Sequence, residues 1–185
     1  MALIVGVVVS LSHRGPDPGD PASAALGGDF DLASSRGPVS LRDFRGRVVA
    51  LYFGYTYCPD ACPTSLQHLG AALKRLPPDE SRQVQSLFIT VDPVRDTTER
   101  LAEYTAFFHP AMLGLGGSEE QVAAVAKRYG VYYALQREDA GDRDYLVDHT
   151  SRTFVVGRDG RVRNILAHGS SPDEVAASLR AALSE

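Results

Sequence analysis

Residues 48–63, VVALYFGYTYCPDACP, join a strand-like run to the only two cysteines of the chain. Residues 48–54 are almost entirely apolar, which is typical of a central strand covered on both faces. Cys58 and Cys62 follow at positions i and i+4, and a helix-like run begins at Thr64. Residues with this spacing on a helical turn have Cβ atoms roughly 5–6 Å apart, so the two sulfurs could close a disulfide or hold one soft metal ion. We therefore expect the chemistry of the chain at this strand–helix junction.

The composition is that of one ordinary globular domain. The chain has 185 residues, of which 44% are hydrophobic and 23% are charged, and its formal net charge is −4. This length favours a single domain. The 19 Lys and Arg residues are spread along the sequence, whereas nucleic-acid binding requires clustered cations. We therefore expect no nucleic-acid partner.

The N-terminal segment differs in composition from the rest. Residues 2–11 form an apolar run that is about half the length of a membrane-spanning helix. A signal peptide has a cationic residue before its apolar run, and this segment has none. Residues 13–28 are rich in Pro and Gly, which is typical of a linker. We interpret residues 1–12 as a partial membrane anchor or signal remnant, with a buried N-terminal strand as the alternative. The folded domain is then expected over residues 29–185.

Strand and helix patterns alternate after the cysteines. Apolar runs and a hairpin signal predict strands over 85–91, 112–115, 153–156 and 162–166. Leucine spacing and capping patterns predict helices over 64–76, 96–108, 118–130 and 171–183. This order predicts a βαβ half followed by a ββα half, which is an α/β fold with a central mixed sheet flanked by helices.

Several polar residues of the chain have structural interpretations. Asp96 is expected to be the N-cap of the helix over 96–108, and Asp92 a turn residue. The polar segment 136–148 is expected to be an irregular surface loop. Asp148, at its end, is either a group that orients a neighbouring ligand or a solvated carboxylate.

His149 is the histidine best placed to join the cysteines. It precedes the strand over 153–156, which we expect to be central, so that its loop would lie beside the cysteine loop. Two thiolates select Cu(I), and an imidazole also suits Cu(II). Zinc would need a fourth ligand, for which Asp60 or Asp148 is the candidate. The residues alone favour copper and leave zinc open.

Three motifs, taken in order, resemble the Sco/SenC family. They are FGYTYCPDACP at 53–63, TVDPVRDT at 90–97 and DHT at 148–150. With the hairpin signal at 157–160, the similarity runs from about residue 30 to residue 183. The resemblance implies a thioredoxin-like fold with an inserted hairpin or loop.

The same resemblance implies a function, a ligand set and a location. Cys58, Cys62 and His149 would be the ligands of copper, carried as Cu(I), Cu(II) or both. The protein would be a metallochaperone that takes copper from a donor protein and delivers it to the dinuclear copper site of cytochrome c oxidase, on subunit II or a similar acceptor. It would be held to the membrane by an N-terminal anchor, with its domain on the extracytoplasmic side, periplasmic or at the cell surface.

Two other functions fit the same cysteines. Cys58 and Cys62 could form the redox disulfide of a thiol-disulfide oxidoreductase that keeps partner cysteines reduced, which would be the chain's one enzymatic activity. Against a thioredoxin-type reductase, the spacing is Cys-x3-Cys, and no proline precedes Thr153, where thioredoxin relatives carry a cis-proline. A purely structural disulfide is less well supported, because closing so short a loop stabilises little.

Overall fold

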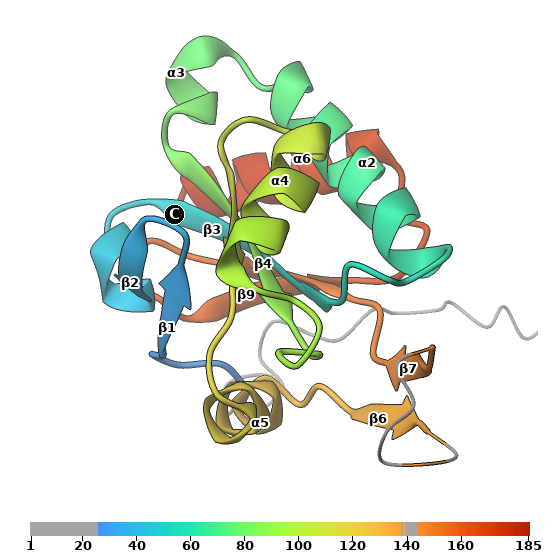
Figure 1. Cartoon of the computed structure of the whole chain (residues 1–185). Coiled ribbons are helices and arrows are strands. Elements are labelled where there is room, and N and C mark those ends of the chain that lie inside the picture. Colours follow the sequence, from blue (N-terminus) through green and yellow to red (C-terminus); the bar gives the residue numbers. More distant parts are fainter. Residues whose placement is uncertain (1–25, 138, 140–143) are drawn as a thin grey trace, which may run out of the picture.

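A five-stranded mixed sheet forms the centre of the protein (Figure 1). The computed structural model describes residues 26–137, 139 and 144–185. Strands β3, β4 and β5 run parallel, whereas β8 and β9 run antiparallel to their neighbours, which confirms the predicted mixed sheet. In the order β5-β4-β3-β8-β9, the strands are Met112–Leu115, Val84–Thr90, Val48–Gly54, Thr153–Val156 and Val162–Leu166.

Helices cover both faces of this sheet. In Figure 1, α2, α4 and α6 lie on one side and α5 lies on the other. The helices predicted over 118–130 and 171–183 are present as α5 and α6, and each begins with a capping box, at Ser118 and Ser171. The helices are η1 (Leu41–Phe44), α2 (Ala61–Arg75), α3 (Pro78–Ser81), α4 (Thr98–Phe108), α5 (Glu119–Arg128) and α6 (Pro172–Leu183).

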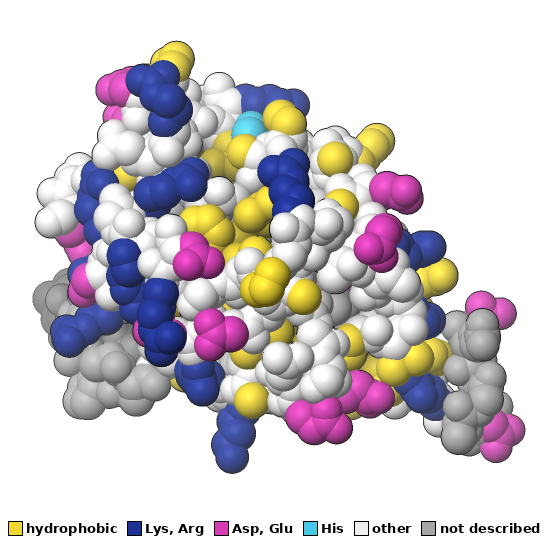
Figure 2. All heavy atoms as spheres, turned by 60° about the vertical axis from the view of Figure 1, so that its left-hand side comes forward, with side chains coloured by type: hydrophobic (Ala, Val, Ile, Leu, Met, Phe, Trp, Pro, Cys, Tyr) yellow, Lys and Arg dark blue, Asp and Glu magenta, His cyan; other side chains and the backbone are white. Residues whose placement is uncertain are grey.

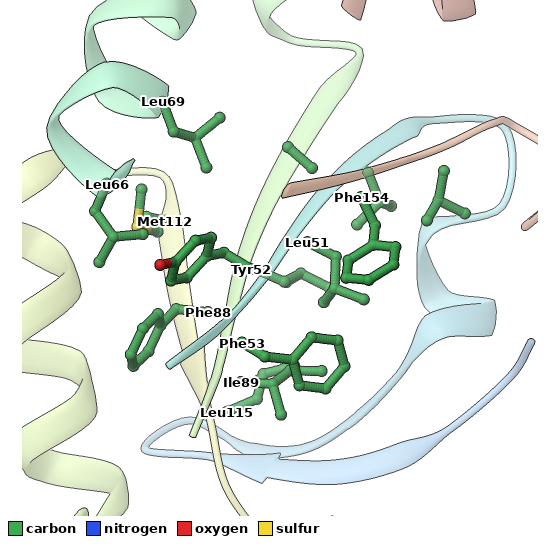
Figure 3. Packing of buried hydrophobic residues seen from close by; sticks show 14 of the residues in the cluster. Leu51, Tyr52, Phe53, Leu66, Leu69, Phe88, Ile89, Met112, Leu115 and Phe154 are labelled. Atoms are coloured by element: carbon green, nitrogen blue, oxygen red, sulfur yellow. The ribbon is translucent and has the colours of Figure 1, made fainter. Parts of the chain in front are cut away.

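Strand β3 is buried along its whole length because its side chains alternate between two apolar layers (Figure 3). Tyr52 stacks on Phe88 of β4 with ring centroids 6.3 Å apart. The next residue, Phe53, points to the opposite face, where its ring lies 5.9 Å from Phe154 and 5.6 Å from Tyr129. Burying each such side chain contributes about 1.5–3 kcal/mol. The position of β3, and of the loop that leaves it, is therefore fixed by the core.

Two short hairpins lie outside the central sheet. Strand β1 (Asp31–Ser34) pairs with β2 (Gly37–Ser40), and β6 (Tyr133–Gln136) pairs with β7 (Leu146–His149). The family resemblance implied an inserted hairpin or loop without giving its position, and the second hairpin ends at His149. The prediction of an irregular loop over 136–148 was wrong over β7, because four residues of alternating burial are too short a pattern to recognise in the sequence.

Two helices begin at other residues than predicted. Helix α2 starts at Ala61 instead of Thr64, so its first turn includes the second cysteine. Helix α4 is capped by Thr97, whose hydroxyl accepts a hydrogen bond from the N–H of Arg100 at 3.2 Å. The prediction of Asp96 as the N-cap was therefore wrong, and Asp96 is buried instead.

The predicted anchor over residues 1–12 and the predicted linker as far as residue 25 lie outside the described residues. Within the part of the chain that the structure describes, no helix combines the length and the hydrophobicity needed to cross a membrane.

Lys and Arg side chains are mixed with acidic, apolar and uncharged ones on the face shown in Figure 2. Several of the arginines form ion pairs. Arg42 and Arg45 both contact Asp29, at 2.9 and 2.5 Å, and Arg163 contacts Asp159 at 3.0 Å. Such exposed pairs contribute little to stability, but they neutralise part of the basic charge on the surface.

Gly70 marks the close packing of α2 against the end of α4. An added Cβ would lie 2.6 Å from the carbonyl oxygen of Phe108. We expect Gly70→Ala to lower the free energy of unfolding by about 1–3 kcal/mol, although alanine favours a helix by about 1 kcal/mol. Urea unfolding followed by circular dichroism measures this. Gln67→Ala, on the exposed side of the same helix, should change stability by less than about 0.5 kcal/mol, and equal stability of the two variants would contradict the close packing.

Candidate metal centre

The loop between β3 and α2 places its two cysteines in different surroundings. Cys58 precedes the helix and is partly exposed, whereas Cys62 lies in the first turn of α2 and is fully buried. Both are free thiols. The backbone N–H of Cys62 donates a hydrogen bond to Cys58 Sγ at 3.4 Å. The Cys58 sulfur therefore sits at the N-terminal end of a helix, a position that stabilises negative charge.

Gly54, the last residue of β3, leaves room for the buried sulfur. A Cβ at this position would lie 2.6 Å from Cys62 Sγ and 2.9 Å from the ring of Phe88. Since real side chains do not tolerate such contacts, Cys62 Sγ packs directly against the strand backbone. A residue without a side chain is thus required where β3 turns into the cysteine loop.

Strand β7 brings His149 to the cysteines from 87 residues away along the chain. Its Nε2 lies 3.3 Å from Cys62 Sγ. The ligand atoms of Cys58, Cys62 and His149 all lie within 4.8 Å of one another. The imidazole is roughly perpendicular to the rings of Tyr52 and Tyr55, with centroids 6.3 and 5.8 Å away. The structure therefore brings together the three residues that were predicted as ligands.

The two carboxylates considered as a fourth ligand lie outside this group. The Asp148 side chain is exposed and accepts a hydrogen bond from Gln136 Nε2 at 2.6 Å, because neighbouring residues of a strand point to opposite faces. Asp60 accepts a weak hydrogen bond from Thr64 Oγ1 at 3.4 Å. Neither carboxylate joins the cluster found among the described residues, so the donor set is two sulfurs and one imidazole.

The two thiols differ in protonation. A hydrogen bond from the Cys62 side chain lowers the pKa of Cys58 to about 3, and hydrogen bonds from His149 and the Cys62 N–H act in the same direction, whereas burial opposes them. Burial raises the pKa of the Cys62 thiol, and the neighbouring Cys58 sulfur raises it further. At neutral pH the pair is therefore one reactive thiolate beside one buried thiol.

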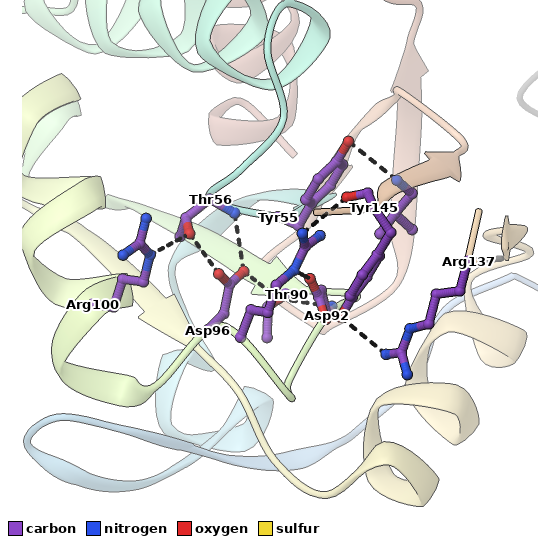
Figure 4. Close-up of polar contacts among 10 residues, drawn as sticks. Tyr55, Thr56, Thr90, Asp92, Asp96, Arg100, Arg137 and Tyr145 are labelled. Atoms are coloured by element: carbon purple, nitrogen blue, oxygen red, sulfur yellow. Dashed lines mark hydrogen bonds and ion pairs between the residues drawn. The ribbon is translucent and has the colours of Figure 1, made fainter. Parts of the chain in front are cut away.

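Sequence reasoning missed the polar contacts that hold the cysteine loop (Figure 4). Asp96 accepts hydrogen bonds from the N–H and the hydroxyl of Thr56, at 3.0 and 2.5 Å, and from the hydroxyl of Thr90 at 2.6 Å. Arg100 Nε donates to Thr56 Oγ1 at 2.7 Å. The predicted topology could have indicated these contacts, because the loops that follow two adjacent parallel strands meet at the same edge of a sheet.

This arrangement can perform two kinds of chemistry. Two sulfurs with one imidazole nitrogen form a donor set that selects Cu(I) and accommodates Cu(II). A low-pKa thiolate beside a second thiol is also the arrangement that thiol–disulfide exchange requires. The geometry alone is compatible with both.

Comparison with known proteins identifies relatives over most of the chain. The SCO1/SenC family model matches residues 18–184. The mitochondrial SCO2 homolog of Bos taurus is 44% identical over 160 residues, which are 85% of this chain and 60% of that relative. The chain thus spans about three-fifths of the length of this relative.

Solved structures agree with the fold. Arabidopsis thaliana ScoI with copper bound has a TM-score of 0.79 and 35% identity, and the match covers 86% of this chain and 99% of that one. Apo Sco1 from Thermus thermophilus has a TM-score of 0.73 and 42% identity, with coverage of 86% and 89%. The predicted thioredoxin-like α/β fold is therefore confirmed.

The lowered pKa of Cys58 predicts its reaction with iodoacetamide. In the reduced, metal-free chain we expect Cys58 to be alkylated first, at a rate that changes little between about pH 5 and pH 8 because the thiolate persists. An ordinary thiol such as glutathione, the reference, should slow by about tenfold per pH unit below its pKa. Peptide mass spectrometry measures both rates. Preferential labelling of Cys62, or a tenfold decline per pH unit at Cys58, would contradict this assignment.

Proposed function

The chain belongs to the SCO1/SenC family, and from that membership we propose that it binds one copper ion and delivers it to an acceptor protein. The observation that carries the proposal is the cluster of Cys58, Cys62 and His149, whose ligand atoms lie within 4.8 Å of one another. Soft sulfur donors with imidazole suit copper. The A. thaliana relative, 35% identical to this chain, was solved with copper bound.

The three ligands have unequal roles in loading and release. Cys58 is the partly exposed thiolate and meets copper first, whereas Cys62 must lose its proton before its sulfur can bind. His149 lies on a two-stranded hairpin outside the central sheet. Such a hairpin opens more easily than the core. A ligand set with two anchored sulfurs and one detachable imidazole suits transfer better than storage.

We extend the proposal to the partners. Family membership supports the dinuclear copper site of cytochrome c oxidase, on subunit II or a similar protein, as the acceptor, and a separate protein as the copper donor.

The location is part of the same proposal. The apolar composition of residues 1–12 and the Pro- and Gly-rich composition of residues 13–28 support a membrane anchor followed by a linker. Family membership, and not the composition of the anchor, supports the extracytoplasmic side as the place where the domain over residues 29–185 acts.

The pairing of Cys58 thiolate with buried Cys62 thiol favours a second function, reduction of a partner disulfide. Cys58 would attack one sulfur of that disulfide and form a mixed disulfide, releasing the first partner thiolate. Cys62, once deprotonated, would attack Cys58 Sγ and release the second. The partner disulfide gains two electrons, and the two cysteines of this chain lose them as their own disulfide forms.

Copper titration of the reduced chain tests the metal site. We expect one copper ion per chain, and an affinity at least about tenfold lower in Cys58→Ser, Cys62→Ser and His149→Ala, because each removes a ligand. Competition with a Cu(I) chelator measures the affinity. His68→Ala is the matched control, since His68 Nδ1 contacts the carbonyl oxygen of Ser170 away from the site. Binding that is unaffected in all three ligand variants would refute the copper site.

His149→Ala also separates the two functions. Disulfide exchange needs only the sulfurs, so we expect this variant to reduce an oxidised copper-acceptor domain of subunit II at a rate close to that of the wild-type chain while failing to transfer copper to it. Cys62→Ser, the control, should lose both activities. Copper transfer that survives His149→Ala unchanged would argue against the histidine as a ligand.

A further inference from the structure

Tyr145, directly before β7, is tied to the segment that follows β4 (Figure 4). Its hydroxyl donates a hydrogen bond to Asp92 Oδ1 at 2.7 Å. Both side chains are buried, with Tyr145 4% and Asp92 1% exposed. A hydrogen bond to a buried carboxylate is among the stronger ones in proteins. The contact therefore fixes the residue at which the chain enters β7.

Arg95 contacts both partners of this hydrogen bond, Asp92 through one atom and Tyr145 through its backbone and its ring. Its Nε donates to Asp92 Oδ2 at 2.5 Å, and its Nη1 donates to the carbonyl oxygen of Tyr145 at 2.9 Å. The guanidinium carbon lies 3.5 Å from the centroid of the Tyr145 ring, which is within the range of a cation–π contact. Tyr145 is thus fixed by its hydroxyl, its ring and its backbone.

The position of the His149 ring depends on the backbone of β7. His149 Nδ1 is buried and has no hydrogen-bond partner among the described residues, so the ring is not anchored through that atom. In its pairing with β6, Tyr133 stands opposite His149. The Val147 N–H donates to Tyr55 Oη at 3.2 Å, which is a second contact between β7 and the cysteine side of the site. A shift of β7 would therefore move the imidazole relative to the sulfurs.

One short segment sets the separation of the two parts of the site. Asp92 binds Tyr145 on the histidine side, and four residues later Asp96 binds Thr56 at the start of the cysteine loop. The two carboxylates are buried on the same connection between β4 and α4. The residue directly before the strand that carries the histidine and the loop that carries the cysteines are thus both hydrogen-bonded to the same short segment between β4 and α4.

We propose that Tyr145 is a positioning residue, which holds His149 against the two sulfurs through its hydrogen bond to Asp92 and thereby slows the release of bound copper. The inference rests on the proposed function for its copper-dependent part. Loss of an interaction that orients a metal ligand typically costs 10–100-fold in affinity. Tyr145 does not touch the metal and acts through the histidine.

The variant that tests this is Tyr145→Phe, which removes one hydroxyl and keeps the ring beside Arg95. The matched control is Tyr129→Phe, at another buried tyrosine, whose hydroxyl donates to the carbonyl oxygen of Gly28 and does not contact the site. Three quantities are measured on the 185-residue chain. They are the rate at which a chelator removes Cu(II), the nitrogen hyperfine signal in the EPR spectrum and, without metal, the hydrogen exchange of the Val147 amide.

In Tyr145→Phe we expect copper release to be about tenfold faster, the nitrogen hyperfine signal to weaken or change, and the Val147 amide, which donates to Tyr55, to exchange faster. The sulfur-to-copper absorption should remain. Tyr129→Phe should lower the thermal stability without any of these changes. In a His149→Ala background, Tyr145→Phe should add nothing to the release rate, because its effect passes through the histidine.

The inference is overturned if Tyr145→Phe releases copper at the wild-type rate, if Tyr129→Phe has the same effect, or if the effect persists without His149. Should the wild-type chain bind no copper, the proposed function fails by itself. The exchange rate of the Val147 amide then decides alone, and an unchanged rate in Tyr145→Phe would show that the tyrosine does not hold β7.

Discussion

The burial of β3 on both faces is the constraint on which the candidate site depends. Aromatic side chains of this strand enter two separate apolar layers, so the strand can neither slide nor rotate without breaking both. Its end therefore delivers the cysteine loop to a fixed place. There Cys62 Sγ lies against the backbone of Gly54, and α2 begins. The packing of the hydrophobic core therefore sets the positions of the two thiols.

The fixed junction between β3 and α2 gives its two cysteines different reactivity. Cys58 lies at a helix N-terminus and is partly exposed, whereas Cys62 is enclosed by the core. A buried thiol that keeps its proton protects the pair from adventitious ligands, and a thiolate at the surface remains ready to react. The two proposed activities, copper binding and disulfide exchange, would both begin from this state. The histidine distinguishes them, because only the metal needs a third donor.

The sequence was sufficient to predict the layers of the fold and the cysteine pair, because long apolar runs and an unusual cysteine spacing are local patterns. His149 was added to the pair from its place before an expected central strand and from the family resemblance. The sequence was insufficient for the contacts between distant segments. Asp96 has the spacing of an N-cap, yet the neighbouring Thr97 is the N-cap. Asp96 is buried and accepts hydrogen bonds from the cysteine loop instead. The hydrogen bond between Tyr145 and Asp92 joins residues 53 positions apart, and a contact over that distance leaves no periodic pattern in the sequence. Strand β7, which carries His149, has too short a pattern to be recognised in the sequence, and the contacts that hold it come from residues far away along the chain.

The packing of Cys62 against Gly54 also determines the order in which donors can be exchanged. With strand backbone on one side, the fully buried Cys62 sulfur lies beside Cys58 and His149. In the proposed copper complex, an acceptor thiolate arriving from solvent would add to the metal before any sulfur departs, and it would first displace the imidazole and then the exposed Cys58. Cys62 would be the last link to break. Transfer would thus proceed stepwise through bridged intermediates between donor and acceptor, and free copper would never be released into solution.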